Sequence, residues 1–179
     1  MKDNDLIRVF LPIIQNALIE QGYTNVQVKQ SNQPTLQGAN TAPTVYFYKL
    51  SDKRYGFLYR KDEYDEIEEV MRHTEEQWYE TSFQLQAWVR QRPITPNQYT
   101  ASDLVNEVAA ILQSDSTLSQ LAANDIGILR IMDIRNPYYT DDRDEFEASP
   151  SFDFILTHRQ TRITEIPVVD SDILNIKRV

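Results

Sequence analysis

The sequence predicts an α+β fold: an antiparallel or mixed sheet with an N-terminal helix and a central helix pair packed on one face. Helical periodicity is confined to residues 3–21 and 102–123, whereas period-two alternation occupies separate stretches. Helices that segregate from strands along a chain are typical of α+β proteins. The 179 residues suffice for one domain with a substantial core. We expect a single domain over residues 1–168 and a C-terminal tail over residues 169–179.

The clearest strand lies within residues 78–91. Apolar or small side chains occupy every second position there, namely Thr81, Phe83, Leu85, Ala87 and Val89. Successive side chains in a strand point to opposite faces, so this pattern predicts a central strand with one dry face. We expect that face to pack on the helices over residues 3–21 and 102–113.

The wet face of the same strand carries an aromatic side chain. Gln84, Gln86 and Arg90 are polar, but Trp88 lies among them. A large apolar side chain on a wet face needs either an apolar neighbour or a partner chain. The sequence therefore predicts that Trp88, with Gln86 and Arg90 beside it, contacts another subunit.

The first helix, over residues 3–21, has Asp3 or Asn4 as an expected N-cap and Gly22 as an expected stop. Pro12 lies inside this run and lacks a backbone N–H. We therefore expect it to kink or split the helix.

The helix pair follows in the middle of the chain. The first member is expected over residues 102–113, with Ser102 as its N-cap and Asp103 at the positive end of the helix dipole. The second is expected over residues 114–123. Asp115 or Ser116 is expected to start it.

Shorter alternating or aromatic runs predict the other strands, over residues 25–30, 44–50, 55–60, 70–77, 126–134 and 151–164. Residues 51–54 are expected to form a hairpin turn, because polar residues there separate two aromatic runs. The acidic stretch over residues 63–76 is also compatible with a helix. Residues 31–43 and 135–150 are expected to be loops.

Composition excludes several classes of function. There are no cysteines, which excludes disulfides, thiolate nucleophiles and cysteine-bound zinc. Only 4 glycines occur, too few for a glycine-rich phosphate cradle. A net charge of −9 opposes binding to DNA phosphates. We expect no membrane association, because no apolar run is long enough to span a bilayer and no signal-peptide pattern is present.

Two acidic clusters raise the alternative of a small metal-dependent hydrolase. They lie within residues 62–69 and 141–147. Carboxylate oxygens bind divalent cations, but neither cluster has the spacing or the glycine of a calcium loop. The 2 histidines, His73 and His158, fall in predicted strands without a nucleophile motif. We therefore expect no catalytic residue, no metal or cofactor site and no enzymatic activity.

Tyrosines are more informative than the ionisable residues. The chain has 10 of them, and aromatic residues and arginine are enriched at protein interfaces. Two of them, Tyr138 and Tyr139, lie just before the second acidic cluster. The candidate interface residues are Gln86, Trp88, Arg90, Tyr138, Tyr139, Asp141 and Asp142.

These segments together resemble a known family. After the first helix come the strand Val-Tyr-Phe-Tyr, the strand over residues 79–89 and the helix over residues 102–113. Then follow Asn-Pro-Tyr-Tyr-Thr-Asp-Asp from residue 136 and Ser-Pro-Ser-Phe-Asp-Phe from residue 149. The acidic loop before an aromatic, alternating last strand is the most distinctive part. The pattern, over residues 1–168, is similar to phage neck and tail-terminator proteins.

The resemblance implies a structural protein of the virion neck that performs no chemistry. It implies a homo-oligomeric ring, a hexamer, which caps the tail tube and joins it to the head connector. It also implies assembly in the host cytoplasm and a channel through which DNA passes. An acidic ring would disfavour specific binding of that DNA. The alternative is a head-completion or adaptor protein, one layer nearer the head.

Overall fold

The structure, a computed structural model, describes residues 1–30, 42–90, 98–140 and 146–167. The helices are α1 (Asp3–Glu20), α2 (Ala101–Gln113) and α3 (Asp115–Ala122). The strands are β1 (Gln27–Gln30), β2 (Thr44–Asp65), β3 (Val70–Trp88), β4 (Ile126–Ile131), β5 (Tyr138–Thr140), β6 (Phe146–Ala148) and β7 (Ser151–Pro167). This element order confirms the predicted α+β class.

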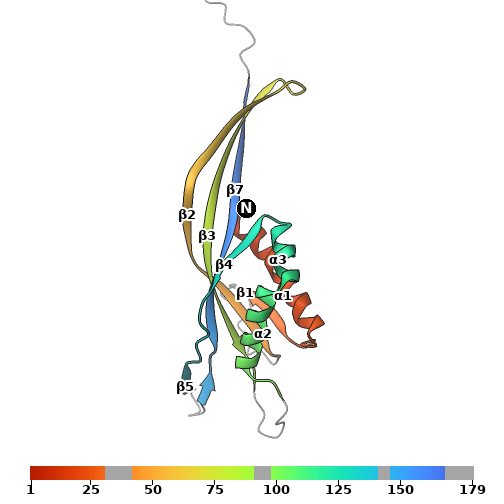
Figure 1. Cartoon of the computed structure of the whole chain (residues 1–179), viewed down its shortest axis with the longest axis vertical. Helices are drawn as coiled ribbons and strands as arrows, with labels where there is room; N and C mark the ends of the chain where they lie inside the picture. The colour runs from red at the N-terminus through yellow and green to blue at the C-terminus, as the bar shows by residue number, and fades with distance from the viewer. Residues whose placement is uncertain (31–41, 91–97, 141–145, 168–179) are drawn as a thin grey trace, which may run out of the picture.

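Five strands form one sheet in the order β1-β2-β3-β7-β4, and β5 and β6 form a separate ribbon. β1 pairs with β2 in parallel, while the other neighbours in the large sheet are antiparallel. The sheet is therefore mixed. The three helices cover one face of its lower half, as predicted (Figure 1).

The dry face predicted for β3 is confirmed. Thr81, Phe83, Leu85, Ala87 and Val89 are buried, and the side chains between them are half-buried. β7 shows the same alternation beside it, because each residue of this part of β7 lies directly opposite a β3 residue. Cross-strand partners share a face, so the buried side chains of both strands form one apolar surface under the helices.

Phe10 of α1 is the centre of the core. It is 2% exposed. The centroid of its ring lies 5.5 Å from that of Phe47, 6.5 Å from that of Phe83 and 5.3 Å from that of Phe154. These three partners come from β2, β3 and β7, so one helical side chain contacts the three central strands at once.

β2 and β3 are longer than the sequence indicated, with 22 and 19 residues. The hairpin turn between them lies at residues 66–69, and the turn predicted at residues 51–54 is wrong. A register shift between Lys49 and Ser51 lets β2 continue its pairing with β3 through that stretch. Its polar residues are exposed strand residues, and their polarity reflects contact with solvent.

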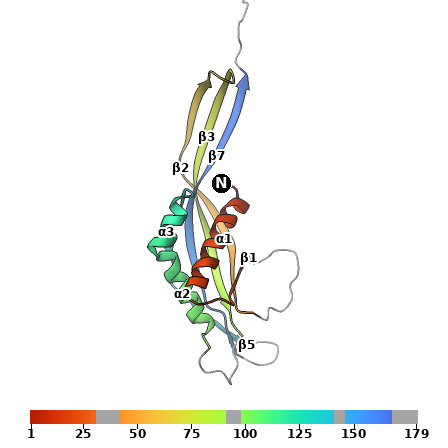
Figure 2. The same cartoon turned by 90° about the vertical axis from the view of Figure 1, so that its right-hand side faces the viewer.

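Above the helices the sheet continues as an uncovered arm (Figure 2). We define the arm as residues 53–80 and 159–167, from β2, β3, their turn and β7, and the rest as the body. At about 3.3 Å per residue, the part of β2 in the arm is roughly 40 Å long. A three-stranded sheet thus projects from the body without a helical layer on either face.

Gly22 stops α1 just after its C-cap, Gln21, as predicted. The amide of Tyr23 donates to the carbonyl of Leu18 (2.9 Å), and the amide of Gly22 donates to the carbonyl of Ile19 (3.0 Å). Gly22 has a φ of 92°, which glycine adopts without steric cost. Pro12 does not split α1, which is continuous over 18 residues.

The N-caps of α1 and α2 differ from the predicted ones, whereas α3 begins at Asp115, as predicted. α1 begins after Lys2, whose side chain forms no capping bond. The N-cap of α2 is Thr100, two residues before the predicted Ser102. The Thr100 hydroxyl accepts from the amide of Asp103 (3.1 Å), and the Asp103 carboxylate accepts from the amide of Thr100 (2.8 Å). This reciprocal pair satisfies two amides that the helix leaves unpaired.

The segment 135–150, predicted as a loop, contains the β5–β6 ribbon. Tyr138 lies opposite Ala148, and Tyr139 lies opposite Glu147. The ribbon is tied to the start of β7, because the amide of Arg135 donates to the carbonyl of Ser151 (2.8 Å). Acidic composition concealed these short strands from the sequence analysis.

We predict that Phe10→Ala lowers the free energy of unfolding by about 3–5 kcal/mol, because it leaves a cavity among three strands. Urea unfolding followed by far-ultraviolet circular dichroism measures this change. The matched control is Phe57→Ala in the arm, where the side chain is 98% exposed. That substitution should change stability by no more than about 0.5 kcal/mol. Equal losses for both variants would contradict the assignment of the core.

Candidate assembly surface

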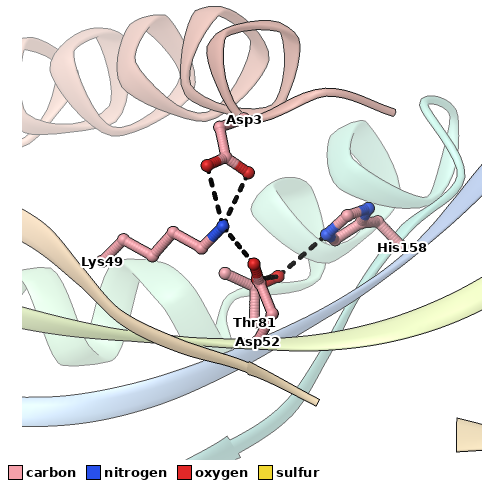
Figure 3. Close-up of polar contacts among 5 residues, drawn as sticks. All are labelled: Asp3, Lys49, Asp52, Thr81 and His158. Atoms are coloured by element: carbon pink, nitrogen blue, oxygen red, sulfur yellow. Dashed lines mark hydrogen bonds and ion pairs between the residues drawn. The ribbon is translucent and has the colours of Figure 1, made fainter. Parts of the chain in front are cut away.

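A polar network joins α1 to three strands where the arm begins (Figure 3). Lys49 Nζ donates to both carboxylate oxygens of Asp3, at 2.7 and 2.8 Å, and forms an ion pair with Asp52. The Thr81 hydroxyl donates to Asp52 Oδ1 (2.7 Å), and its oxygen lies 2.9 Å from Nε2 of His158. The network therefore connects α1, β2, β3 and β7 at the base of the arm.

Hydrogen bonding in this network selects the neutral form of His158. Thr81 has a single hydroxyl proton and donates it to Asp52, so its oxygen accepts the proton of His158 Nε2. The other ring nitrogen, Nδ1, is buried without a partner among the described residues. A proton on Nδ1 would be a buried, unsatisfied donor, which costs free energy.

The pKa shifts of His158 and Asp52 also favour a neutral His158. Burial is the largest cause that lowers the pKa of His158, and the positive amino group of Met1 adds to it. For Asp52, burial alone would raise the pKa, but hydrogen bonds from Lys49 and Thr81 outweigh it and lower the pKa. The network is thus most stable with Asp52 ionised and His158 neutral.

The second face of the sheet in the body, which we call the open face, has no helix over it in the part of the chain that the structure describes (Figures 1 and 2). A row of polar side chains crosses it. Tyr48 donates to Gln84 Oε1, and Gln84 Nε2 donates to Asp153 Oδ1 (2.6 Å). Arg135 then donates to both oxygens of Asp153, at 3.0 Å. These bonds hold the open face in one arrangement without a partner chain.

The arm extends the open face upward with aromatic side chains. Tyr55 lies opposite Trp78, and their ring centroids are 6.2 Å apart. The Arg159 guanidinium lies 5.9 Å from the centroid of the Trp78 ring and donates to Glu76 and Asp125, both at 3.1 Å. Trp78 is still 39% exposed, so this cluster is ordered within the subunit but only partly covered by it.

Large apolar side chains farther along the arm are in water. Phe57 is 98% exposed, Ile163 is 61% exposed and Tyr59 is 54% exposed. Apolar side chains left in water are surface that a partner chain gains free energy by covering. The arm is therefore the strongest candidate for contact with another chain.

Charged side chains along the arm pair with one another across strands. Lys53 forms an ion pair with Glu80 (3.3 Å), Arg60 with Glu75 (3.3 Å) and Arg72 with Asp65 (2.7 Å). Exposed ion pairs of this kind add little to the free energy of unfolding. Their effect is to neutralise charge between the apolar positions. A partner that packs on the arm therefore meets fewer unpaired charges.

The first acidic cluster lies at the tip of the arm and folds on itself. Asp65 Oδ1 accepts from the amides of Ile67 (3.0 Å) and Glu68 (3.2 Å). No three His, Asp or Glu side chains converge as metal ligands among the residues with a described position. The second cluster has residues 141–145 outside the described part. The alternative of a metal-dependent hydrolase therefore receives no support from the acidic tip.

The candidate interface residues predicted from sequence fall in different places. Gln86 and Trp88 lie on the open face, half-buried, and Gln86 already donates to Ser149 within the subunit. Arg90 follows β3 and is exposed. Tyr138 and Tyr139 form β5 in the ribbon at the opposite end of the molecule from the arm (Figure 1). Asp141 and Asp142 lie outside the described residues.

The sequence analysis missed the arm as a candidate surface. The sequence feature that marks the arm is the alternation of Tyr55, Phe57 and Tyr59 within a charged stretch. Aromatic side chains at every second position among charged ones are compatible with a strand that is exposed to solvent. The supposed turn at residues 51–54 removed that stretch from the long hairpin to which it belongs.

Residues 5–168 match the family model described as E217 gateway protein gp29. The chain belongs to this family. The match covers both the body and the arm and stops one residue after β7. It confirms the predicted resemblance to phage neck and tail-terminator proteins.

A solved structure shares the fold of this gateway-family chain. It is the sheath/tube terminator of an extracellular contractile injection system named PVC, in the extended state. The TM-score is 0.54 at 8% sequence identity, and the match covers 100% of this chain and 64% of that chain. The chain therefore spans somewhat less than two thirds of the length of that terminator, and at this identity the likeness shows the fold alone.

Curated proteins yield no match to the sequence. Among the described helices, none is long and apolar enough to cross a membrane. The family match supports a structural protein of the phage neck, the region where tail and head join.

The two histidines predict opposite effects of pH on stability. The pKa of His158 is lowered in the folded protein. Above pH about 6.5 the imidazole is neutral in the folded and unfolded states, so it does not oppose folding. As the pH falls below that value the unfolded protein takes up a proton that the folded protein does not, and the free energy of unfolding decreases. The pKa of His73 is raised by its hydrogen bond to Asp62. Its contribution is present below pH about 6.5 and is lost as the pH rises through the folded pKa.

We therefore expect His158→Gln to flatten the loss of stability between pH 7.5 and pH 5.5, and His73→Gln to steepen it. Urea unfolding of the wild type and both single variants at the two pH values measures the slopes. The chain has 2 histidines, so each variant leaves one imidazole. Identical slopes for the two variants would show that His158 is not held neutral by the network.

Proposed function

We propose that this gateway-family protein forms a hexameric ring that caps the tail tube and joins it to the head connector. The observation that carries this proposal is the family match over residues 5–168. The match also supports one domain over residues 1–168, followed by a tail over residues 169–179. We further propose that DNA passes through the ring, and that the ring assembles in the host cytoplasm before it enters the virion neck.

The uncovered arm supports an oligomeric state. A single subunit leaves Phe57, Tyr59 and Ile163 in water on a projecting sheet. Burying apolar area of this kind contributes about 25 cal/mol per Å². A ring places a neighbour beside each arm, and neighbouring rings of the tail or connector lie within reach of a projection roughly 40 Å long.

The open face supports lateral contact between subunits. Trp88 at the lower end of this face and Trp78 in the arm are both incompletely covered. Tryptophan is the residue type most enriched among side chains that dominate interface energies. The polar row between them is already satisfied within the subunit, so contact there costs little reorganisation.

The charge supports passage of DNA without binding. The chain carries −9, and a ring repeats that charge in every subunit. Phosphate binding depends on Lys and Arg that replace counterions. Acidic walls instead repel phosphates, so DNA slides past them without a specific contact.

We predict that Trp78→Ala and Trp88→Ala each weaken ring assembly about 30-fold or more, because truncating an interface hot spot costs about 2 kcal/mol. Sedimentation velocity over a range of concentrations measures assembly, and thermal unfolding measures folding. The control is Leu118→Ala on α3, away from the open face and 38% exposed. If the tryptophan variants lose stability and assembly equally, both residues serve the fold of the subunit.

A binding measurement tests the channel. Fluorescence anisotropy of a labelled DNA duplex is followed as the assembled protein is added at about 50 mM salt, where phosphate contacts are strongest. We expect no change in anisotropy at micromolar protein. Binding that weakens steeply as salt is added would show a basic DNA-binding surface and contradict the acidic channel.

Electron microscopy of virions tests the position of the protein in the neck. When the gene is deleted, we expect complete heads and separate tails whose tubes have no terminal ring, as seen by electron microscopy. Tails with a normal terminal ring that cannot attach to heads would instead place the protein one layer higher, as a head-completion or adaptor protein. Normal virions would contradict both positions.

A further inference from the structure

The arm has two outer edges, formed by strands that run in the same direction. β2 and β7 are both antiparallel to β3, which lies between them (Figure 2). β1 pairs with the outer edge of β2 only as far as Phe47, and β4 pairs with the outer edge of β7 only as far as His158. Above these residues neither edge has a partner strand in the ranges that the structure describes. The backbone groups of such an edge can bond to a strand of another chain.

The outer edge of β2 already accepts a parallel strand lower down. There the 4 residues of β1, Gln27–Gln30, pair in parallel with Thr44–Phe47. The last irregularity in the pairing of β2 with β3 ends at Tyr59, and from Tyr59 to Asp65 that pairing is regular. The upper part of β2 is therefore a second regular stretch of the same edge, long enough for a parallel partner of similar length.

The outer edge of β7 at the same level is also regular. Its pairing with β3 has no register shift from Ser151 to Pro167. The β-branched residues of its upper part are Thr161, Ile163, Thr164 and Ile166, and residues of this kind favour strand pairing. Both edges of the arm are thus competent to pair above the last bulge of β2.

A ring determines which edges can meet. Its subunits are related by rotation in a head-to-tail sequence, so neighbouring arms point in similar directions. β7 of one subunit then runs alongside β2 of the next in the same direction. Two β7 edges would meet only about a twofold axis, which a head-to-tail ring does not place between neighbours.

We propose that β7 of each subunit pairs in parallel with β2 of the next, so that the arms close into one continuous β-barrel. The strand that covers the upper edge of β7 is thus supplied by a second copy of the chain. This inference rests on the ring put forward as the proposed function, and it adds the contact through which the arms join.

Side-chain charge excludes a pairing without stagger. Tyr59 and Thr161 lie at the same level, because both pair with Glu76 of β3. By the same registers Arg60 lies level with Arg162, and Glu63 lies level with Glu165. Neighbours paired at equal level would therefore place two like-charged pairs side by side, which is unfavourable.

A stagger of two residues removes both of these pairs. It places Ile163 beside Tyr59 of the next subunit and Glu165 beside its Lys61, which joins apolar with apolar and carboxylate with cation. An even shift keeps the faces of the sheet matched, and strands in a closed barrel are staggered. Ile163 is 61% and Tyr59 is 54% exposed in the single subunit, so this register covers both. The opposite shift would place Glu165 beside Asp65.

Cysteine cross-linking tests the pairing, because the chain has no cysteine of its own. In the double variant Tyr59→Cys, Ile163→Cys, β3 separates the two positions within a subunit by two strand spacings, about 9 Å or more, which is too far for a disulfide. Any disulfide between them must join two subunits. Under mild oxidation of the full chain, we expect covalent oligomers that extend to the size of the ring. The control, Arg60→Cys, Ile163→Cys, turns one thiol to the other face and should react about tenfold more slowly.

Sedimentation velocity of the wild type separates failure of the pairing from failure of the ring. A wild-type ring whose double variant forms no disulfide, or reacts no faster than the control, would overturn the pairing and leave the ring intact. Absence of any ring would overturn both. A covalent dimer of the single variant Ile163→Cys would show that two β7 edges meet, and would also overturn the proposal.

Charge reversal gives a second measurement that needs no cysteine. Glu165→Lys places two lysines side by side between subunits, and we expect it to weaken assembly roughly fivefold at each interface. It also removes the ion pair of Glu165 with Arg72 inside the subunit, which Lys61→Glu does not restore. Recovery of assembly in the double variant Lys61→Glu, Glu165→Lys therefore reports on the contact between subunits. A double variant that assembles no better than Glu165→Lys alone would overturn the register.

Discussion

The unbroken pairing of β3 with β7 is the interaction on which the rest of the structure depends. It continues without a register shift from Gln86 opposite Ser151 to Val70 opposite Pro167. A single alternation of faces therefore extends from the buried body to the tip of the arm. The helices pack only on the lower part of one face, where β3 and β7 carry phenylalanines. The sheet continues beyond them because β3 stays paired with β2 on one side and with β7 on the other as far as the tip of the arm.

The boundary between body and arm is chemical as well as geometric. Below it, Phe10 packs on rings from three strands. At the boundary, Asp3 and Lys49 bring charge to the start of α1, and His158 is the last buried side chain of β7 among those described. Above it, side chains of the same strands face water. A network that ties α1 to β2, β3 and β7 at this level holds the direction in which the arm leaves the body.

An assembly role follows from what the fold leaves uncovered. Proteins of this size normally protect both faces of a sheet or keep the uncovered one polar. Here the body has a polar open face whose side chains bond to one another, while the arm exposes Phe57, Tyr59 and Ile163. Surface of that composition is stable in water only at a cost, and other chains can cover it. The match to the gateway-family model extends over both the body and the arm.

The sequence by itself determined the fold class, the dry face of β3, the end of α1 at Gly22 and the resemblance to phage neck proteins. These features depend on information that is local in the sequence: the periodicity of apolar residues, the conformational freedom of one glycine and the order of residue types along the chain. Only the tertiary structure decided the length of β2, the position of the hairpin turn and the use of Thr100 as a cap. A polar stretch such as residues 51–54 has the same composition in a turn and in an exposed strand, and its cross-strand partners in β3 made it a strand. Trp88 was placed correctly on the open face, whereas the arm emerged only when distant residues of β7 were paired with β3.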